Sequence, residues 1–396
     1  MRAYVEVLTP RDHLLLAASG LLARVPLAVV GFSALLVVRR STGEFGLAGA
    51  VSAAVVASGA LVGPALGRWG DRRGQTVALR TTALVAVLGA LLFVAVTSLD
   101  APAWLVVPAA VAVGAGAAPV GSFTRTRWAR TYPRDGDRAD PRLATAFALE
   151  GVFDELVWVA GPALASLVAA LADPRLALLL ACGAGAAGCL ALSAQRHGAP
   201  VDTVRTRSWS LPVTTPDVLG VLAAGFAVGA VFGLADLSAV ALTTERGVPQ
   251  LAGSVLGAGA LGAVVGGLVV GTLRPVADPR RGAVLTSVFF GCGYAALATV
   301  PGVVGILLLS FVAGATYAPF GVAVNRLVER AAPAARLTES LAWVSTAVTA
   351  GTAVGTALGG LVVDAAGARG GYLLVAPLAA LPFVFTLAGT RWGSAR

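Results

Sequence analysis

Ionisable residues inside two long apolar segments are the first candidates for chemistry in this chain. Arg24 lies near the middle of the first apolar segment, and Glu150, Asp154 and Glu155 lie in the fifth. On a helix, Glu150 and Asp154 would share a face at i,i+4, and Glu155 would point about 100° away. Charges in an apolar medium are usually paired or functional. We therefore expect Arg24 to pair with Asp154 or Glu155, which leaves another carboxylate free to exchange a proton.

Proton exchange is expected from the balance of charges. Three acids and one arginine cannot all stay charged in a low dielectric, so we expect at least one acid to hold a proton near neutral pH. The alternative is a purely structural network that specifies helix packing. Asp236, in the outer part of the seventh apolar segment, would contact a substrate or gate, or else be a water-exposed charge at a helix end.

Twelve apolar segments must position these residues. The chain has 396 residues, of which 57% are hydrophobic and 12% charged, and a helix needs roughly 20 apolar residues to cross a bilayer. Because backbone in lipid must satisfy its own hydrogen bonds, we predict helices rather than open strands. The predicted spans are residues 13–38, 46–66, 78–98, 102–124, 143–171, 175–194, 217–242, 250–273, 283–300, 302–324, 338–363 and 371–389.

The basic residues between the spans predict the orientation. All 29 are arginine, and most of them fall in one set of alternate segments. Positive charge resists translocation, so this set is predicted to be cytoplasmic, together with both termini. The other set carries only Arg39, Arg40, Arg175, Arg246 and Arg369.

Matching positions in the two halves of the chain indicate an internal repeat. Arg142-Leu143 aligns with Arg336-Leu337, and Pro119-x-Gly121 aligns with Pro319-x-Gly321. Two parallel six-helix halves are the plan of a secondary transporter. We predict an N-terminal bundle at residues 1–194, a cytoplasmic linker at 195–216 and a C-terminal bundle at 217–396.

The segment after the second span carries a recognisable motif. It reads Gly67-Arg-Trp-Gly-Asp71-Arg72-Arg73-Gly74 and resembles the signature Gly-x-x-x-Asp-Arg/Lys-x-Gly-x-Arg/Lys-Arg/Lys of the major facilitator superfamily. It matches at Gly67, Asp71, Arg72 and Gly74, but Thr and Val replace the final basic pair. The resemblance implies the facilitator fold, an all-α membrane protein with 12 transmembrane helices in two pseudo-symmetric six-helix bundles.

The resemblance also implies roles for the motif. Asp71 would face the positive N-terminal end of the eleventh helix, a contact worth roughly 0.3–1 kcal/mol, and Arg72 would hold cytoplasmic loops together. The alternative is a basic turn that only sets topology.

In the fifth span, Gly161-Pro162 begins a stretch similar to the antiporter signature Gly-Pro-x-x-Gly-Gly, although Ala and Ser replace the last two glycines. The fourth span lacks the buried arginine of many drug–proton antiporters. Glu339 would favour the helix dipole in the first turn of the eleventh helix.

Other functional classes lack support in the sequence. The basic residues are scattered rather than gathered into a nucleic-acid footprint, no metal-ligand spacing is present, and no clustered polar residues indicate a membrane-embedded enzyme. We expect no cofactor and a monomer in a bacterial cytoplasmic membrane.

The function predicted from these patterns is alternating-access transport of a small molecule, with proton-coupled efflux of a drug-like or amphipathic metabolite. The alternatives are proton-coupled uptake of a sugar or similar metabolite, lipid translocation, and a sensor that transports nothing. The aromatic candidates for substrate contact, which would otherwise only pack or anchor, are Trp104, Trp158, Phe232, Tyr294, Tyr317 and Trp343.

Overall fold

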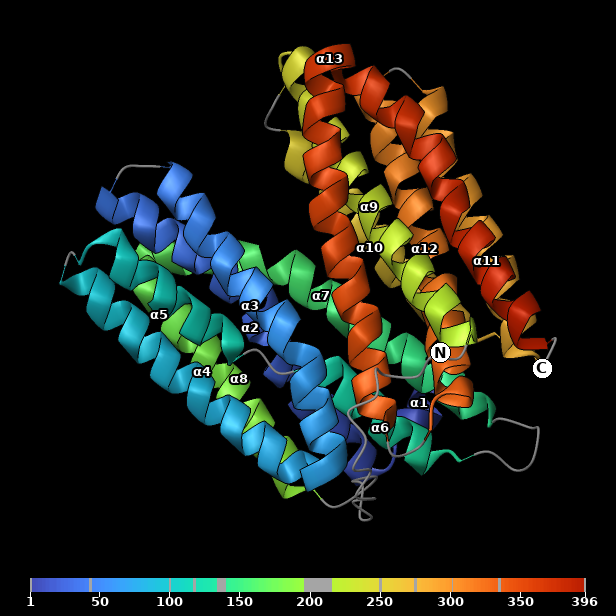
Figure 1. Ribbon diagram of the computed structural model, residues 1–396, viewed down its shortest axis with the longest axis horizontal. Coiled ribbons are helices and arrows are strands. Elements are labelled where there is room, and N and C mark those ends of the chain that lie inside the picture. Colours follow the sequence, from blue (N-terminus) through green and yellow to red (C-terminus); the bar gives the residue numbers. More distant parts are fainter. Residues whose placement is uncertain are drawn as a thin grey trace. The chain divides into compact units, whose positions relative to one another are not determined.

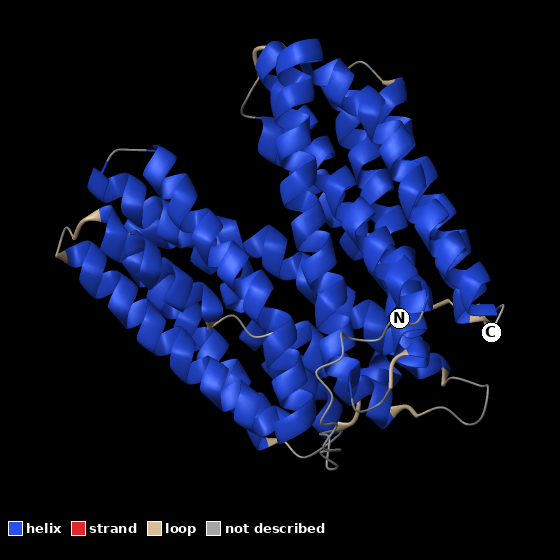
Figure 2. Ribbon diagram, in the orientation of Figure 1, coloured by secondary structure: helices blue, strands red, loops and turns tan. Residues whose placement is uncertain are grey.

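The computed structural model describes residues 2–42, 45–99, 101–116, 119–133, 140–195, 216–248, 251–273, 276–300, 302–333 and 336–394. All regular structure in these residues is helical (Figures 1 and 2), which confirms the predicted fold class. The elements are α1 (Arg2–Leu8), α2 (Arg11–Thr42), α3 (Phe45–Arg73), α4 (Gln75–Ser98), α5 (Ala103–Ala115), α6 (Val120–Thr131), α7 (Pro141–Leu171), α8 (Pro174–Ala194), α9 (Pro216–Glu245), α10 (Ala252–Val270), α11 (Pro279–Ala295), the 3₁₀ turn η2 (Ala296–Thr299), α12 (Val303–Ala331) and α13 (Leu337–Ser394).

The apolar spans correspond to these helices. Ten helices of the described chain are long and apolar enough to cross a membrane. One of them is α13, which covers two predicted spans, whereas α7 covers the fifth span and is not among the ten. The fourth span is divided between α5 and α6. Twelve crossings and two cytoplasmic termini therefore stay predictions.

The division of α13 is at Gly367. This residue has φ 67° and ψ −176°, a backbone conformation outside the helical region that is nearly restricted to glycine. The helix that follows is capped from another element, because the Ala368 amide donates to Oε1 of Glu245 at 2.7 Å. A carboxylate at a helix N-terminus satisfies a free N–H group and interacts favourably with the helix dipole. Glu245 thus ties the end of α9 to the second half of α13.

The chain forms two compact units. Unit 1 contains Met1–Val5, Tyr132–Glu155 and Trp209–Arg396, and unit 2 contains Glu6–Thr131 and Leu156–Ser208. The two units follow the predicted halves, except that the start of α1 and the first part of α7 pack with the C-terminal helices. The predicted bundle boundaries stay a prediction, and residues 196–215 of the predicted linker lie outside the described part of the chain.

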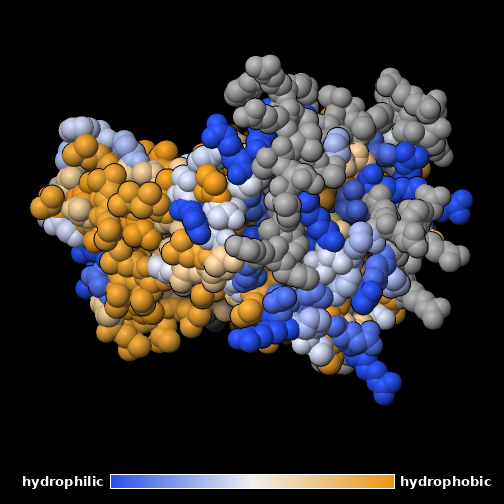
Figure 3. All heavy atoms as spheres, turned by 90° about the horizontal axis from the view of Figure 1, so that it is seen from below, coloured by the Kyte–Doolittle hydropathy of each residue, from blue (hydrophilic) through white to orange (hydrophobic). Residues whose placement is uncertain are grey.

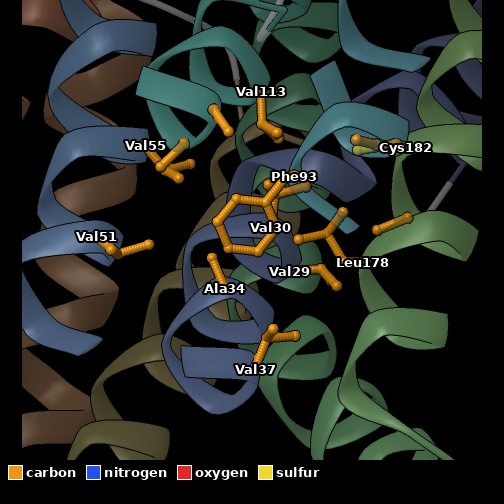
Figure 4. Close-up of a cluster of buried hydrophobic side chains, with 14 of the residues drawn as sticks. Val29, Val30, Ala34, Val37, Val51, Val55, Phe93, Val113, Leu178 and Cys182 are labelled. Carbon is orange, nitrogen blue, oxygen red and sulfur yellow. The ribbon is translucent and has the colours of Figure 1, made fainter. Parts of the chain in front are cut away.

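Unit 2 has a well-packed apolar centre. Figure 4 shows the ring of Phe93 from α4 among Val30 and Ala34 of α2, Val113 of α5 and Leu178 of α8. All five side chains are buried. Since lipid is as apolar as these side chains, close packing rather than exclusion of water holds them together.

Unit 1 relies on glycine pairs at its main helix contact. On α9, Gly229 and Gly233 are four residues apart and lie against the α13 backbone, and on α13, Gly351 and Gly355 lie against the α9 backbone. Methyl groups at these positions would overlap backbone atoms of the facing helix. Small residues at this spacing let two helix backbones approach closely in a membrane.

Apolar side chains cover one face of unit 2. Figure 3 shows hydrophobic side chains gathered over these helices, on the left of the view. On α4, Leu84, Leu88, Leu91 and Leu92 are all exposed and lie on the outside of the unit. A large apolar surface of this kind fits lipid rather than water.

The facilitator-type motif lies on a helix rather than in a loop. The α3 helix continues through Arg73, and only Gly74 separates it from α4. Gly74 has φ 90° and ψ 143° at the N-cap position of α4. Side chains other than hydrogen are strained in this region. The last glycine of the motif therefore permits the sharp turn between α3 and α4.

We expect Gly74→Ala to lower the free energy of unfolding by roughly 1–3 kcal/mol because of this backbone strain. The control is Gly63→Ala, since Gly63 is helical in α3 and has open space beside it. Thermal unfolding of the purified variants measures both effects. Equal melting temperatures for the two variants would contradict this account of the turn.

Candidate functional site

Arg24 is buried in α2, as the sequence predicts. Its side chain is 1% exposed, and its Nη2 donates to Oγ1 of Thr124 on α6 at 2.9 Å. Gly20 and Gly121 make room for the guanidinium, because a Cβ at either position would approach its nitrogens at 3.1 and 3.4 Å. The hydrogen bond to a neutral hydroxyl offsets part of the cost of burying this charge.

Two further arginines, Arg125 and Arg127, are buried on α6, which continues past the predicted end of the fourth span at residue 124. The guanidinium of Arg127 belongs to a fully buried side chain. The cytoplasmic position of this segment stays a prediction. Arg127 donates from Nε to Oε1 of Gln75 at 2.8 Å and from Nη1 to the carbonyl oxygen of Gln195 at 3.2 Å. It thereby joins the start of α4 to the end of α8. The signal in the sequence was Trp128, a large apolar residue that lies past the predicted end of the span at residue 124.

The three acids of α7 lie on the unit 1 part of that helix. Glu150 is fully buried, and Asp154 and Glu155 are partly exposed. Glu155 is the last residue of this part, because α7 passes into unit 2 at Leu156. Arg24 belongs to unit 2, so its pairing with Asp154 or Glu155 stays a prediction.

Asp236 is not an isolated charge. It lies well inside α9, rather than at a helix end, and is exposed. Glu155 is within electrostatic range of both Asp154 and Asp236. No hydrogen bond or ion pair joins Glu155 or Asp236 to a described residue of unit 1. The fold thus brings carboxylates from two helices within electrostatic range of each other, and no described residue of unit 1 forms an ion pair with Glu155 or Asp236.

Tyrosines adjoin this acidic group. Tyr294 on α11 is within electrostatic range of Asp236 and Glu155, and Tyr372 on α13 is within range of Asp236. Tyr294 was one of several aromatic candidates in the sequence, whereas Tyr372 was missed. It follows Gly371 in an ordinary apolar segment, and no local pattern indicates that it meets α9.

The facilitator-type motif has only part of its predicted surroundings within unit 2. Asp71 is buried near the end of α3. Its predicted partner, the N-terminus of the eleventh span, belongs to the other unit, so this contact and the role of Arg72 stay predictions. Gly70 lies against the ring of Phe123, because an added Cβ would meet Cε1 at 2.5 Å. Close approach of α3 to α6 therefore accounts for this glycine.

Two glycines near the end of α10 accept hydrogen bonds from residues that the sequence did not single out. Gly267 accepts a hydrogen bond from the Tyr4 hydroxyl at 2.5 Å, and the Gly271 carbonyl accepts one from Thr145 at 2.6 Å. Burial raises the pKa of Tyr4 to about 12, so the hydroxyl is a neutral donor at physiological pH. These bonds fasten α1 and α7 to the end of α10.

Two acids in the first turns of other helices form ion pairs with arginines of unit 1. Glu339 lies in the first turn of α13, as predicted, and pairs with Arg336 at 3.0 Å. Asp217 in the first turn of α9 pairs with Arg280 of α11 at 2.6 Å. In the described residues, no group of three or more His, Cys, Asp or Glu side chains could hold a metal ion.

The antiporter-like segment forms a close helix contact. At Gly161, a Cβ would lie 3.0 Å from Cβ of Ala28 and 3.1 Å from Cγ2 of Val29 on α2. The α7 helix continues past position 162, and the side chain of Pro162 lies outside the described part of the chain. The glycine therefore has a packing role in unit 2 whatever the direction of transport.

A family model described as Major Facilitator Superfamily matches residues 16–306. No curated protein sequence matches the chain. Among solved structures, a bacterial homologue of the iron transporter ferroportin in the outward-facing state has a TM-score of 0.73 at 17% identity, with 98% of this chain and 100% of the other covered.

Two further solved structures are similar over nearly the whole chain. The fucose:proton symporter of E. coli has a TM-score of 0.69 at 13% identity, covering 95% of this chain and 97% of its own. A human organic anion transporter has a TM-score of 0.67 at 16% identity, covering 95% and 100%. At these identities the similarity establishes the fold and not the cargo.

We expect Arg127→Ala to lower the free energy of unfolding by about 2–3 kcal/mol, because hydrogen bonds from a charged group are lost and their buried acceptors are left unsatisfied. Thermal unfolding of the purified protein measures this. Arg130→Ala is the matched control, since Arg130 is on the same helix and exposed. If both variants unfold at the same temperature, Arg127 does not join α4 to α8 as described.

Proposed function

This chain belongs to the major facilitator superfamily, and on that premise we propose that it exports a drug-like or amphipathic metabolite in exchange for protons. The family match and the three solved structures support secondary transport across a membrane. The coupling ion, the direction and the cargo are the proposed part.

The observation that carries the proposal is the carboxylate of Glu155. It has no hydrogen bond or ion pair to a described residue of its unit, and it lies within electrostatic range of Asp154 and Asp236. Like charges repel strongly in a low dielectric. A proton bound to one carboxylate would relieve that repulsion, and its release would restore it. Such a group can therefore link proton occupancy to conformation.

The place of these acids on α7 supports a coupling role. They lie on the part of the helix that packs in unit 1, and the helix enters unit 2 immediately after Glu155. A change of charge on this segment alters the cost of keeping it in an apolar environment. Alternating access in transporters of parallel-repeat design moves one bundle against the other. A charge that changes on a helix shared by both units is suited to drive such a step.

Export is favoured by the similarity of the Gly161-Pro162 segment to the antiporter signature. The solved structures of similar fold include a proton symporter, a homologue of an iron transporter and an organic anion transporter, so the fold alone does not give a direction. Uptake of a sugar or similar metabolite and translocation of a lipid are the competing functions.

We expect Glu155→Gln, Asp154→Asn or Glu150→Gln to abolish coupled proton movement in at least one case. Protein in inside-out vesicles with an acidic interior should release protons when a transported compound is added. The coupling variant should fall to the level of protein-free vesicles. Asp364→Asn is the control, since Asp364 is an exposed acid elsewhere in unit 1. Unchanged proton release in all three α7 variants would rule out this mechanism and leave a structural role for the acids.

The direction of transport is tested in cells. Cells that produce the protein should accumulate less of at least one labelled compound from a panel of amphipathic amines, dyes, sugars and lipids than cells without it. An uncoupler should remove the difference, because export would depend on the proton gradient. Higher accumulation in the producing cells would contradict export and support uptake.

A further inference from the structure

We infer that the C-terminal helices bind a small organic cation, a protonated or quaternary amine, at Asp236 between the side chains of Tyr294 and Tyr372. This inference deepens the proposed function and rests on it, because a bound cation is cargo only if the chain is a transporter. It assigns a substrate class that neither the family match nor the similar structures provide.

A pocket in unit 1 has Asp236 in its wall. Its other polar lining residues are Tyr294 of α11, Ser310 of α12 and Tyr372 of α13, and the remainder of its wall is almost entirely aliphatic. The pocket is partly open to solvent. Small-molecule sites typically have such apolar walls with a few converging polar groups.

The charge of the pocket is negative and not balanced within its unit. Asp236 is exposed, and no hydrogen bond or ion pair joins it to a described residue of unit 1. Glu155, which is within electrostatic range of Asp236, has none either. Although its side chain is accessible, Asp236 lies in a pocket whose wall is mostly aliphatic, and a cation or hydrogen-bond donors that approach the carboxylate there would stabilise it. A positively charged ligand would supply the missing partner.

The hydroxyl of Tyr372 is a second and independent indication of a ligand. The side chain is 4% exposed, and its oxygen has no hydrogen-bond partner in the described part of the chain. An unsatisfied buried hydroxyl costs roughly 1–3 kcal/mol. Because Tyr372 lines the same pocket as Asp236, an N–H or O–H group of a cation bound at Asp236 could donate to the Tyr372 oxygen.

Aromatic rings next to the pocket favour an organic cation. Phe232 precedes Asp236 by one turn of α9, and its ring centroid lies 5.5 Å from that of Tyr294 and 4.9 Å from that of Tyr317. The rings of Tyr294 and Phe290 are 4.6 Å apart. Aromatic faces attract ammonium groups, most strongly where water is excluded. A carboxylate at the edge of such a cluster matches a charged nitrogen that carries alkyl groups.

A divalent metal ion fits the same residues less well. Calcium takes six to eight oxygen ligands, and magnesium requires a near-ideal octahedron. Asp236 is the one ionised side chain in the pocket wall, beside three hydroxyl groups. An alkylammonium ion needs a single counter-charge and apolar contacts, which the pocket provides.

The test measures binding to the purified full chain by calorimetry, with no proton gradient. Choline is the probe, and 3,3-dimethyl-1-butanol, which has the same shape without the charge, is the matched neutral compound. We expect choline to bind and the alcohol to bind at least about tenfold more weakly. Asp236→Asn should weaken choline binding at least about tenfold, and Tyr372→Phe about two- to fivefold, since it removes only the hydroxyl.

The control variant is Asp364→Asn, which removes an exposed carboxylate outside the pocket and should bind choline like the unchanged protein. Thermal unfolding without ligand verifies that each variant is folded. Equal binding of choline and the alcohol, or wild-type choline affinity in Asp236→Asn, would overturn the inference. Binding of Mn²⁺ that depends on Asp236, without binding of choline, would replace it with a metal site. Because no gradient is used, failure here is distinguishable from failure of proton coupling.

Discussion

The cost of holding ionised groups in an apolar environment is the constraint on which this structure depends. Each such group costs several kcal/mol unless partners surround it. In unit 2, hydrogen-bond acceptors and the small size of neighbouring glycines lower the cost of burying arginine side chains. Thr124 accepts from Arg24, Gln75 and the Gln195 carbonyl accept from Arg127, and glycines leave room for the guanidinium of Arg24.

The carboxylates of unit 1 differ in whether they have an ion-pair partner within the unit. Acids at its helix ends are paired, as Asp217 is with Arg280 and Glu339 with Arg336. Glu155 and Asp236, which lie within electrostatic range of each other, have no such partner among the described residues of the unit. Uncompensated charge has a free-energy cost that packing alone does not repay. Within the described residues of unit 1, this uncompensated charge is the physical basis for proposing proton exchange and cation binding at Glu155 and Asp236.

The remaining features hold the helices in register so that these groups stay close. Glycines on α9 and α13 bring the two backbones into contact, and Glu245 fixes the second half of α13, which carries Tyr372, to the end of α9. The helix that presents Asp236 is thus tied to the helix that presents Tyr372. Solved structures with the same fold carry different cargoes, which is consistent with a shared scaffold whose specificity depends on a few side chains.

The sequence by itself determined the apolar helices, the facilitator-type motif and the burial of Arg24 and Glu150. Hydropathy and the spacing of residues are local properties of the chain, and they decide which segments can lie in a membrane. Only the tertiary structure decided that Asp236 lies near Glu155, that Tyr372 lines the same pocket, and that Tyr4 bonds to Gly267. It also showed that Arg125 and Arg127 are buried on α6, past the predicted end of the fourth span. These outcomes depend on which faces of distant helices meet. Contacts between residues far apart in the chain have no signature in a local sequence pattern, and the close packing of helices through small residues determines them.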